Sequence, residues 1–315
     1  MPLLSICIPT YNRCSFLMKN LHYFLERNSS EIEVVISDNA STDDTYQCVT
    51  QLIEERQLSN FRYYRNDVNI GPDANFSKVL ELSEGNYSLL LGDDDFLQPD
   101  FLNVLLPFIK ENSTASFICL SSKEMIRFAK NKKSQQFDID QLGEFFTIVG
   151  PHITFMSLMI FNTSVLQTVL KKGFHYADNL YQSFLAVTTI KKNSSLPYHI
   201  LYYMPFAYNG ETTAANYDFY TVFVDKVLEL YQYGLPAKSI REINAIYQKS
   251  FMFFLFKFTI ILKAIRVNPK LRRNNYICLR SMPMAWIAVF PCYVVPSFIW
   301  SGLYDLFRKM KKKCS

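Results

Sequence analysis

Hydrophobic positions in the first 120 residues alternate between short continuous runs and runs spaced as on a helix. The continuous runs are short and rich in β-branched and aromatic residues, which is typical of buried strands. Leu17, Leu21 and Phe24, between the first two runs, have helical spacing instead. This pattern predicts strands at 4–8, 32–37, 61–64, 87–91 and 115–120, with helices between them. We therefore expect an α/β fold with a mostly parallel sheet sandwiched by helices.

Several local signals predict where the helices begin. Ser41 and Asp44 are three residues apart, as in a capping box at the start of a helix. Pro72 and Pro99 each precede a helical pattern, and proline is favoured in the first turn of a helix. We expect helices to begin at these three places.

The pattern changes twice in the second half of the chain. It becomes mixed between residues 143 and 216 and then turns helical, with a long apolar-rich helix predicted at 247–267. These changes predict a catalytic domain at 1–216 and a helical C-terminal region at 217–315.

Residues 284–304 contain no charged side chain and are about as long as a bilayer span. Pro291, Pro296 and Gly302 interrupt this stretch, and a run of Lys and Arg follows it at 308–313. Its Trp and Tyr residues are typical of the membrane interface. We therefore predict a membrane-associating segment at 284–313. A continuous transmembrane helix and a buried C-terminal helix pair are the alternatives.

Composition excludes several protein classes. Apolar residues make up 49% of the 315 residues and charged residues 19%, which excludes a disordered chain or a coiled coil. Seven cysteines lie scattered without metal-ligand spacing, which disfavours a disulfide framework or a zinc site. The N-terminus reads as a strand and not as a signal peptide, so we expect the protein to stay inside the cell. Aromatic residues make up 16%, enough either to fill the core or to stack on ligands.

The net charge of +5 is modest, and the basic excess lies late in the chain. Because those basic residues adjoin an apolar segment, we expect a contact with anionic lipid and no nucleic acid partner.

Polar clusters follow three of the predicted strands. They are residues 10–13, residues 38–39 and an acidic triplet formed by Asp93, Asp94 and Asp95. In parallel sheets, ligands bind outside the carboxyl ends of the strands. No G-x-G-x-x-G and no P-loop motif is present, so a classical dinucleotide or P-loop site is not expected.

The acidic triplet has the chemistry of a divalent cation site. Adjacent carboxylates repel one another, and a hard cation such as Mg²⁺ or Mn²⁺ relieves that repulsion. If the strand continues through the triplet, Asp93 and Asp95 point the same way. The alternative is a cluster of acids at the start of the helix after Pro99, where negative charge is favourable.

Four motifs in register resemble glycosyltransferase family 2. They are PTYNR, DNAST-DDT, NIG-PDAN and LLLGDDDFLQP, and the resemblance covers residues 3–215. It implies a GT-A fold and a bacterial enzyme that transfers a sugar from a nucleotide-diphosphate donor with inversion. Gly92 stands where the common D-x-D-D motif has its first Asp. The form GDDD is similar to some O-antigen enzymes, including abequosyltransferases, which suggests CDP- or dTDP-linked donors beside UDP-linked ones.

The resemblance also implies roles for individual residues. Thr10, Tyr11 and Asp38 match positions that hold the base and ribose, and the acidic triplet matches the metal-bearing motif. The implied metal ligands are Asp93 and Asp95, with Glu211 as a further candidate. The complete set expected to bind the nucleotide-sugar is Pro9, Thr10, Tyr11, Asn12, Arg13, Asp38, Asn69, Gly71, Asn75, Asp93 and Asp94.

The stretch 173–179 matches the family segment that holds the catalytic base. Asp178 fits the base, which takes the proton from the acceptor hydroxyl, and Ala177 replaces the usual Glu. Asp178 could equally cap a helix predicted at 180–187.

We expect the acceptor to be a saccharide on a polyprenyl diphosphate, reached at the cytoplasmic side of the bacterial inner membrane. Two alternatives stay open at this point. One is a catalytically inactive relative that binds a nucleotide or sugar, and the other is a nucleotidyltransferase, which also uses paired acids and Mg²⁺.

Overall fold

The structure is a computed structural model that describes residues 1–170, 180–207, 219–264, 279, 282, 289 and 290. The chain divides into two compact units. Unit 1 comprises Met1–Gln141 and His152–Thr213, and unit 2 comprises Leu142–Pro151 and Ala214–Ser315. The short segment Leu142–Pro151 therefore belongs with the C-terminal helices, which its place in the sequence did not reveal.

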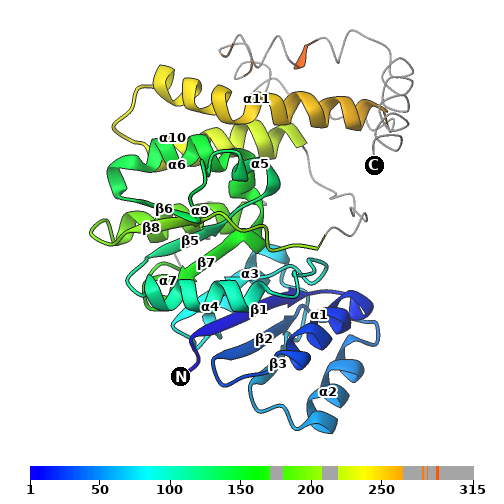
Figure 1. The fold of residues 1–315 in the computed structure, drawn as a ribbon. Helices are drawn as coiled ribbons and strands as arrows, with labels where there is room; N and C mark the ends of the chain where they lie inside the picture. The colour runs from blue at the N-terminus through cyan, green and yellow to red at the C-terminus, as the bar shows by residue number, and fades with distance from the viewer. Residues whose placement is uncertain (171–179, 208–218, 265–278, 280–281, 283–288, 291–315) are drawn as a thin grey trace, which may run out of the picture. The chain divides into compact units, whose positions relative to one another are not determined.

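Unit 1 is built on an eight-stranded sheet, in the order β3-β2-β1-β4-β7-β5-β8-β6 (Figure 1). Strands β1 to β4 on one side of the sheet run parallel, as do β5 and β8. Strand β7 is antiparallel to β4 and β5, and β6 is antiparallel to β8. The strands are β1 (Leu4–Thr10), β2 (Ile32–Asp38), β3 (Phe61–Arg65), β4 (Tyr87–Leu90), β5 (Phe117–Leu120), β6 (Ser134–Phe137), β7 (Met159–Asn162) and β8 (Tyr198–Leu201). The predicted α/β fold with a mostly parallel sheet is confirmed.

Helices cover the sheet on both faces. Every residue of β1, β2 and β4 is buried, and successive side chains of a strand point to opposite faces, so both faces must be covered. Helix α3 (Pro72–Glu81) packs on β1 and β2, and α9 (Tyr181–Lys192) packs on β5, β7 and α3. The other helical elements of this unit are α1 (Cys14–Glu26), α2 (Thr45–Arg56), α4 (Phe101–Glu111), α5 (Lys123–Ile126), α7 (Thr163–Gln167), η1 (Ile139–Gln141) and η3 (Met156–Leu158).

Two of the three predicted helix starts differ from those in the structure. Helix α2 begins at Thr45 with Asp44 as its N-cap, so the capping box predicted at Ser41 is wrong. The reason is that the Ser41 hydroxyl donates to Asp38 at the end of β2. Helix α4 begins at Phe101, two residues after Pro99, whereas α3 begins at Pro72 as predicted.

Unit 2 is helical, and aromatic side chains form much of its core. Its helices are α6 (Leu142–Val149), η5 (Thr221–Lys226), α10 (Val227–Gly234) and α11 (Ile240–Ala264), and η2 (Gly150–Thr154) spans the boundary. The rings of Phe146 and Tyr231 stack with centroids 4.3 Å apart, which joins α6 to α10. Tyr247 and Phe251 stack along α11, which begins earlier than the predicted 247.

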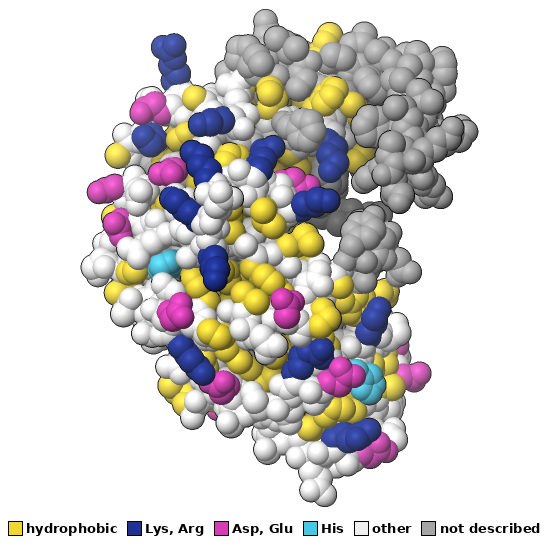
Figure 2. Space-filling model, in the orientation of Figure 1, with side chains coloured by type: hydrophobic (Ala, Val, Ile, Leu, Met, Phe, Trp, Pro, Cys, Tyr) yellow, Lys and Arg dark blue, Asp and Glu magenta, His cyan; other side chains and the backbone are white. Residues whose placement is uncertain are grey.

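No helix within the described ranges is long and apolar enough to cross a membrane. Residues 284–313 lie outside those ranges except for Val289 and Phe290, so their membrane contact stays a prediction. On the face drawn in Figure 2, the described basic and acidic side chains lie interspersed.

Candidate active site

The sheet brings the three polar clusters to one edge. Thr10 pairs with Asp38 across β1 and β2, and Asp38 pairs with Arg65 across β2 and β3. Strand β4 runs parallel to β1 and ends at Leu90, opposite Cys7. The carboxyl ends of four parallel strands therefore meet at one edge, where α/β sheets bind their ligands.

Asn12 joins the loop after β1 to the loop after β2. Its backbone N–H donates to Ser41 Oγ at 2.9 Å, and its Oδ1 accepts from Thr42 N at 2.7 Å. Asn12 has a φ of 54°, a left-handed conformation that asparagine tolerates better than most residues. Tyr11 beside it is 43% exposed, so part of this residue is open to solvent.

Asp38 is fully buried beneath this edge. Its Oδ1 accepts from the backbone N–H and the hydroxyl of Ser41, and its Oδ2 accepts from Tyr63 Oη. Arg65 Nε lies 3.8 Å from Asp38 Oδ2. Burial, followed by the hydrogen bond to Asp38, raises the pKa of Tyr63. These contacts show that Asp38 connects the ends of β2 and β3 at this edge, and its contact with the nucleotide stays a prediction.

An asparagine network links the end of β2 to α3. Asn39 Nδ2 donates to Asn69 Oδ1 at 2.9 Å and to the Gly71 carbonyl at 3.2 Å. Gly71 is the N-cap of α3 with a φ of 86°, which favours glycine. Asn75 is buried and accepts from Ser37 Oγ at 2.7 Å. The predicted residues Asn69 and Gly71 thus lie near the edge, whereas Asn75 fastens α3 to β2.

The acidic triplet lies in a turn. Strand β4 ends at Leu90, and the Asp95 N–H donates to the Gly92 carbonyl at 3.2 Å. The alternation of side chains along a strand therefore does not apply, and Asp93 and Asp95 engage different partners. The alternative of a helix cap is not what the structure shows either, because the N-cap of α4 is Asp100.

Arg13 is the partner that brings two of the carboxylates together. Its Nη1 lies 3.5 Å from Asp93 Oδ1 and is also hydrogen-bonded to Asp94 Oδ2. Thr10 Oγ1 donates to Asp93 Oδ2 at 2.7 Å. The sequence pattern placed Arg13 among the donor-binding residues but gave no sign of this pairing with the triplet.

Asp95 turns back over Gly92, where Ser157 holds it. Ser157 is fully buried, accepts from the Gly92 N–H at 2.8 Å and donates to Asp95 Oδ2. A Cβ at position 92 would lie 2.6 Å from Asp95 Oδ2. The Asp95 carboxylate thus fills the space that a side chain at 92 would take, which accounts for glycine at this position.

Asn20 of α1 donates hydrogen bonds to the backbone of this turn. Its Nδ2 donates to the Asp93 carbonyl at 2.9 Å and to the Gly92 carbonyl at 3.4 Å. Its buried Oδ1 has no hydrogen-bond partner within the described structure. Neither Asn20 nor Ser157 was predicted from the sequence, because each is distant from the triplet along the chain and belongs to no motif.

The pKa values of three charged groups at this turn are shifted. Burial raises the pKa of Asp93 to about 6, although the hydrogen bond from Thr10 and the charge of Arg13 act against it. Burial also raises the pKa of Asp95 to about 7, and the neighbouring carboxylates add to the effect. Burial lowers the pKa of Arg13, but Asp93 and Asp94 outweigh it, so the net shift is upward.

The residues present fit a divalent cation. Oxygens of Asp93 and Asp94 converge on one positively charged atom, Arg13 Nη1, and carboxylate oxygens are the ligands that Mg²⁺ and Mn²⁺ prefer. Among the residues that the structure describes, no three acidic, His or Cys side chains form a ready-made cage. A cation here would therefore complete its coordination with ligand oxygens, as Mg²⁺ does in phosphate-handling sites.

Asp178 and Glu211 lie outside the described residues. Helix α9, which follows Asp178 in the sequence, begins at Tyr181 with Leu180 as its N-cap. Both residues keep their predicted roles as predictions.

The chain matches glycosyl transferase family 2 over residues 5–170, more than half of its length. It belongs to that family. The match confirms the resemblance found in the motifs, and it favours glycosyl transfer over the alternative of nucleotidyl transfer.

Curated relatives match part of the chain. The abequosyltransferase RfbV of Salmonella typhimurium is 39% identical over 121 residues, which are 37% of this chain and 35% of the relative. The Campylobacter jejuni GalNAc(5)-diNAcBac-PP-undecaprenol beta-1,3-glucosyltransferase is 31% identical over 126 residues, which are 39% and 40% of the two chains. The matched stretch therefore spans well under half the length of these relatives.

Solved structures extend the similarity of fold along almost the whole chain. S. aureus TarS 1-349 in complex with UDP-GlcNAc has a TM-score of 0.59 at 17% identity, covering 93% of this chain and 80% of that one. The mannosyltransferase PcManGT from Pyrobaculum calidifontis, in complex with GDP-Man and Mn²⁺, has a TM-score of 0.55 at 12% identity. That match covers 98% of this chain and 80% of the other. At these identities the similarity shows the GT-A fold alone.

Proposed function

We propose that this protein transfers a sugar from a nucleotide-diphosphate donor to a hydroxyl group of a lipid-linked saccharide in the synthesis of a bacterial surface polysaccharide. The observation that supports this most directly is the convergence of Asp93 and Asp94 at the carboxyl edge of the sheet, next to Thr10 and Tyr11. The family match supports the reaction class.

Asp93 and Asp94 are the carboxylates that the geometry favours as cation ligands. They face the same point, whereas Asp95 is held over Gly92 by Ser157. Asp95 was predicted as a ligand with Asp93, and we now propose that it shapes the turn instead. When bound, Mg²⁺ or Mn²⁺ supplies a Lewis acid that stabilises the negative charge of the leaving nucleoside diphosphate.

The start of α1 offers an anion site beside this turn. The positive end of a helix dipole favours phosphate groups, and the first turn of α1 contains no acidic residue. Arg13 is the N-cap residue of this helix. We propose that this end of α1 and Arg13 bind the donor's diphosphate, while the exposed ring of Tyr11 and the buried Asp38 contribute to the nucleoside pocket.

Asp178 is our candidate for the catalytic base. In an inverting transfer, a carboxylate takes the proton of the acceptor hydroxyl as its oxygen attacks the anomeric carbon. The resemblance of 173–179 to the family's base segment supports this role. Glu211 remains a candidate contact for the cation or the diphosphate.

The identity of relatives supports a lipid-linked acceptor. One relative is named for an undecaprenol-linked substrate, and another is named a putative colanic acid biosynthesis glycosyl transferase, WcaA, of Escherichia coli. An acceptor on a polyprenyl diphosphate would place the enzyme at the cytoplasmic side of the inner membrane, and the basic segment at 308–313 would add attraction to anionic lipid.

The donor is the first point to test. Thermal unfolding is measured with UDP, CDP, GDP and dTDP, with and without Mn²⁺. A nucleotide at a hundred times its Kd adds about 2.7 kcal/mol to the free energy of unfolding. The true donor nucleotide is therefore expected to raise the melting temperature when Mn²⁺ is present and not when Mn²⁺ is absent. If none of the four produces a shift with Mn²⁺, the proposed donor site is wrong.

Turnover is tested with the matching nucleotide-sugar and membrane extracts that carry lipid-linked saccharides. Asp178→Ala is expected to lower sugar transfer by about a hundred-fold or more while donor binding in the thermal assay stays near that of the wild type. Asp140→Asn, on the exposed element η1, serves as the matched control. Equal rates for Asp178→Ala and wild type would remove Asp178 as the base.

A further inference from the structure

Arg13 occupies an unusual place for a cationic side chain. It is the N-cap residue of α1 and makes no capping hydrogen bond through its side chain. The positive end of a helix dipole repels a cation, so the helix itself does not favour arginine here. The attraction must come from the acidic turn across from it.

The contacts of Arg13 show what that attraction is. Its Nη1 lies within reach of Asp93 Oδ1 and Asp94 Oδ2, and its side chain is 33% exposed. The guanidinium also lies over the ring of Phe16, at 5.9 Å from the centroid. Arg13 therefore neutralises part of the triplet's charge from a loop position that is open to solvent on one side.

The guanidinium and a divalent cation would compete for the same oxygens. A cation bound by Asp93 and Asp94 must approach the two oxygens that now face Nη1, and two positive charges at that separation repel one another. Arg13 would have to leave the carboxylates as the cation arrives. Its nearest favourable anion is then the donor's diphosphate, because that group binds the same cation from the open side.

We propose that Arg13 couples cation binding to donor binding: it is the counter-ion of Asp93 and Asp94 in the empty enzyme and moves to the donor's diphosphate when a divalent cation takes its place. This inference rests on the proposed function. Displacement of Arg13 lowers the affinity of the enzyme for the cation alone. The contact of Arg13 with the diphosphate offsets this loss when the donor is present.

Two measurable consequences follow from this exchange. Without nucleotide, removing the charge at position 13 strengthens cation binding, because nothing has to be displaced. With nucleotide bound, the same change reduces the factor by which cation and nucleotide raise the affinity for each other, since the diphosphate loses one cationic partner. Because linkage is reciprocal, each ligand must change the affinity of the other by the same factor.

The test measures Mn²⁺ binding directly by electron paramagnetic resonance of the free ion, with no turnover involved. Arg13→Gln is expected to bind Mn²⁺ alone more tightly than wild type, on the order of five-fold. Mn²⁺ binding is then measured in saturating UDP, CDP or dTDP. The nucleotide that raises the Mn²⁺ affinity of the wild type should raise the Mn²⁺ affinity of Arg13→Gln by a smaller factor. Arg13→Ala repeats the test with a side chain that makes no polar contact.

The matched control is Arg27→Gln at the other end of α1, where Arg27 pairs with Glu26, and it should bind Mn²⁺ as the wild type does. Mn²⁺ affinity in Arg13→Gln and Arg13→Ala that equals or falls below that of the wild type would overturn the exchange. The proposed cation site fails separately if Asp93→Asn binds Mn²⁺ as tightly as the wild type. Thermal unfolding of each variant confirms that the protein measured is folded.

Discussion

Carboxylates and an arginine meet at both ends of the same parallel strands, with different outcomes. At the amino end, Glu33 of β2 pairs with Arg62 of β3. At the carboxyl end, about 16 Å further along the strands, Arg13 faces the acidic triplet. The two clusters share their chemistry but differ in how many hydrogen-bond donors surround each buried carboxylate.

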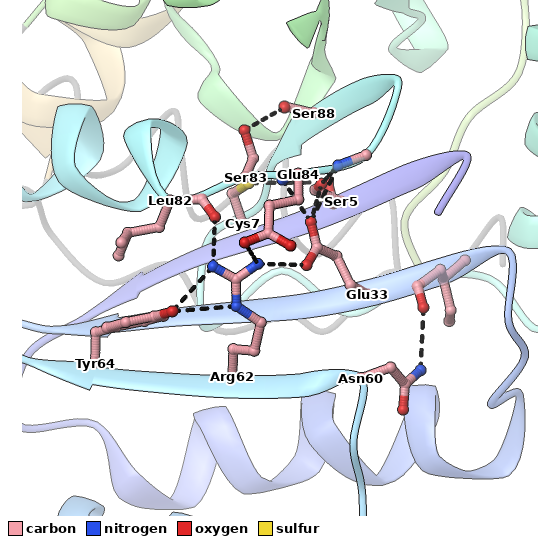
Figure 3. Close-up of polar contacts among 12 residues, drawn as sticks. Ser5, Cys7, Glu33, Asn60, Arg62, Tyr64, Leu82, Ser83, Glu84 and Ser88 are labelled. Atoms are coloured by element: carbon pink, nitrogen blue, oxygen red, sulfur yellow. Dashed lines mark hydrogen bonds and ion pairs between the residues drawn. The ribbon is translucent and has the colours of Figure 1, made fainter. Parts of the chain in front are cut away.

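The amino-end cluster is satisfied atom by atom (Figure 3). Glu33 Oε1 accepts from Ser5 Oγ at 2.5 Å, from Glu84 N at 2.7 Å and from Gly85 N at 3.1 Å, and its Oε2 accepts from Arg62 at 2.9 Å. Arg62 donates further to the Leu82 carbonyl and Tyr64 Oη. This cluster connects β1, β2, β3 and the turn before β4, so we interpret it as a structural clasp.

At the carboxyl end, the described contacts give the buried carboxylates of Asp93 and Asp95 fewer hydrogen-bond donors than Glu33 has. Burial raises the pKa of Asp93 and Asp95. Removing one partner from a buried, hydrogen-bonded ion pair is strongly destabilising, whereas buried carboxylates with raised pKa values are typical of functional sites. The difference teaches that the number of donors around each buried carboxylate, more than the residue types, distinguishes a structural clasp from a candidate binding site.

The contrast predicts first that Asp94→Asn strongly lowers sugar transfer and leaves the protein folded. Asp94 is 31% exposed, so its replacement should change the free energy of unfolding little. Loss of one charged ligand should lower sugar transfer by about a hundred- to a thousand-fold. Turnover and thermal unfolding are measured together, and an active Asp94→Asn would show that the acidic turn is not the cation site.

At the amino end of the strands, Glu33→Ala should lower the free energy of unfolding. It removes the acceptor of the Ser5 hydroxyl, of two backbone N–H groups and of one Arg62 N–H, and breaking a buried ion pair costs about 3–5 kcal/mol. Urea denaturation measures this loss, and Glu33→Gln, which keeps one acceptor oxygen, should lose less. Donor affinity at a temperature where the variant is folded should match that of the wild type. A selective loss of donor affinity would contradict the interpretation as a clasp.

Asp95→Asn tests the raised pKa of Asp95 through the pH dependence of the free energy of unfolding. The pKa of Asp95 is about 7 in the folded protein and about 3.9 in an unfolded chain. Between those values the folded state binds more protons, so the free energy of unfolding of the metal-free wild type should rise as pH falls from 8 toward 4. Asn does not titrate, so the variant should show a shallower dependence and be more stable than the wild type at pH 8 by about 1 kcal/mol.

Thermal melts at pH 8, 7, 6 and 5 in a metal chelator measure this dependence, with Asp140→Asn as the control. Parallel curves for Asp95→Asn and the wild type would show that the pKa of Asp95 is not raised in the folded protein.

A smaller effect is expected for Ser157→Ala. It removes the hydroxyl that joins the Gly92 N–H to Asp95, which should cost about 1–2 kcal/mol and weaken Mn²⁺ binding modestly through a less ordered turn. Ser164→Ala, at an exposed hydroxyl that donates to Asn162, is the comparison. Equal stability of Ser157→Ala and Ser164→Ala would show that the Ser157 hydroxyl does not hold the turn.

Much of unit 1 follows from local patterns. The strands that become β1 to β5 and the start of α3 at Pro72 were all predicted, because burial of both strand faces and the fixed φ of proline leave clear traces in the sequence. Ser41 was misassigned for the opposite reason. A capping box and a bond to Asp38 use the same hydroxyl, and only the position of the end of β2 decides between them.

The motifs alone determined the family, the edge of the sheet that carries the candidate site, and the presence of the acidic triplet there. The tertiary structure decided how the triplet is arranged: a turn in place of a strand, Asp93 and Asp94 converging on Arg13, and Asp95 held by Ser157. The physical reason is distance along the chain. Repeating hydrophobic patterns and short motifs record contacts between sequence neighbours, whereas the partners of these carboxylates lie 62 to 83 residues away and meet them only when the sheet has formed.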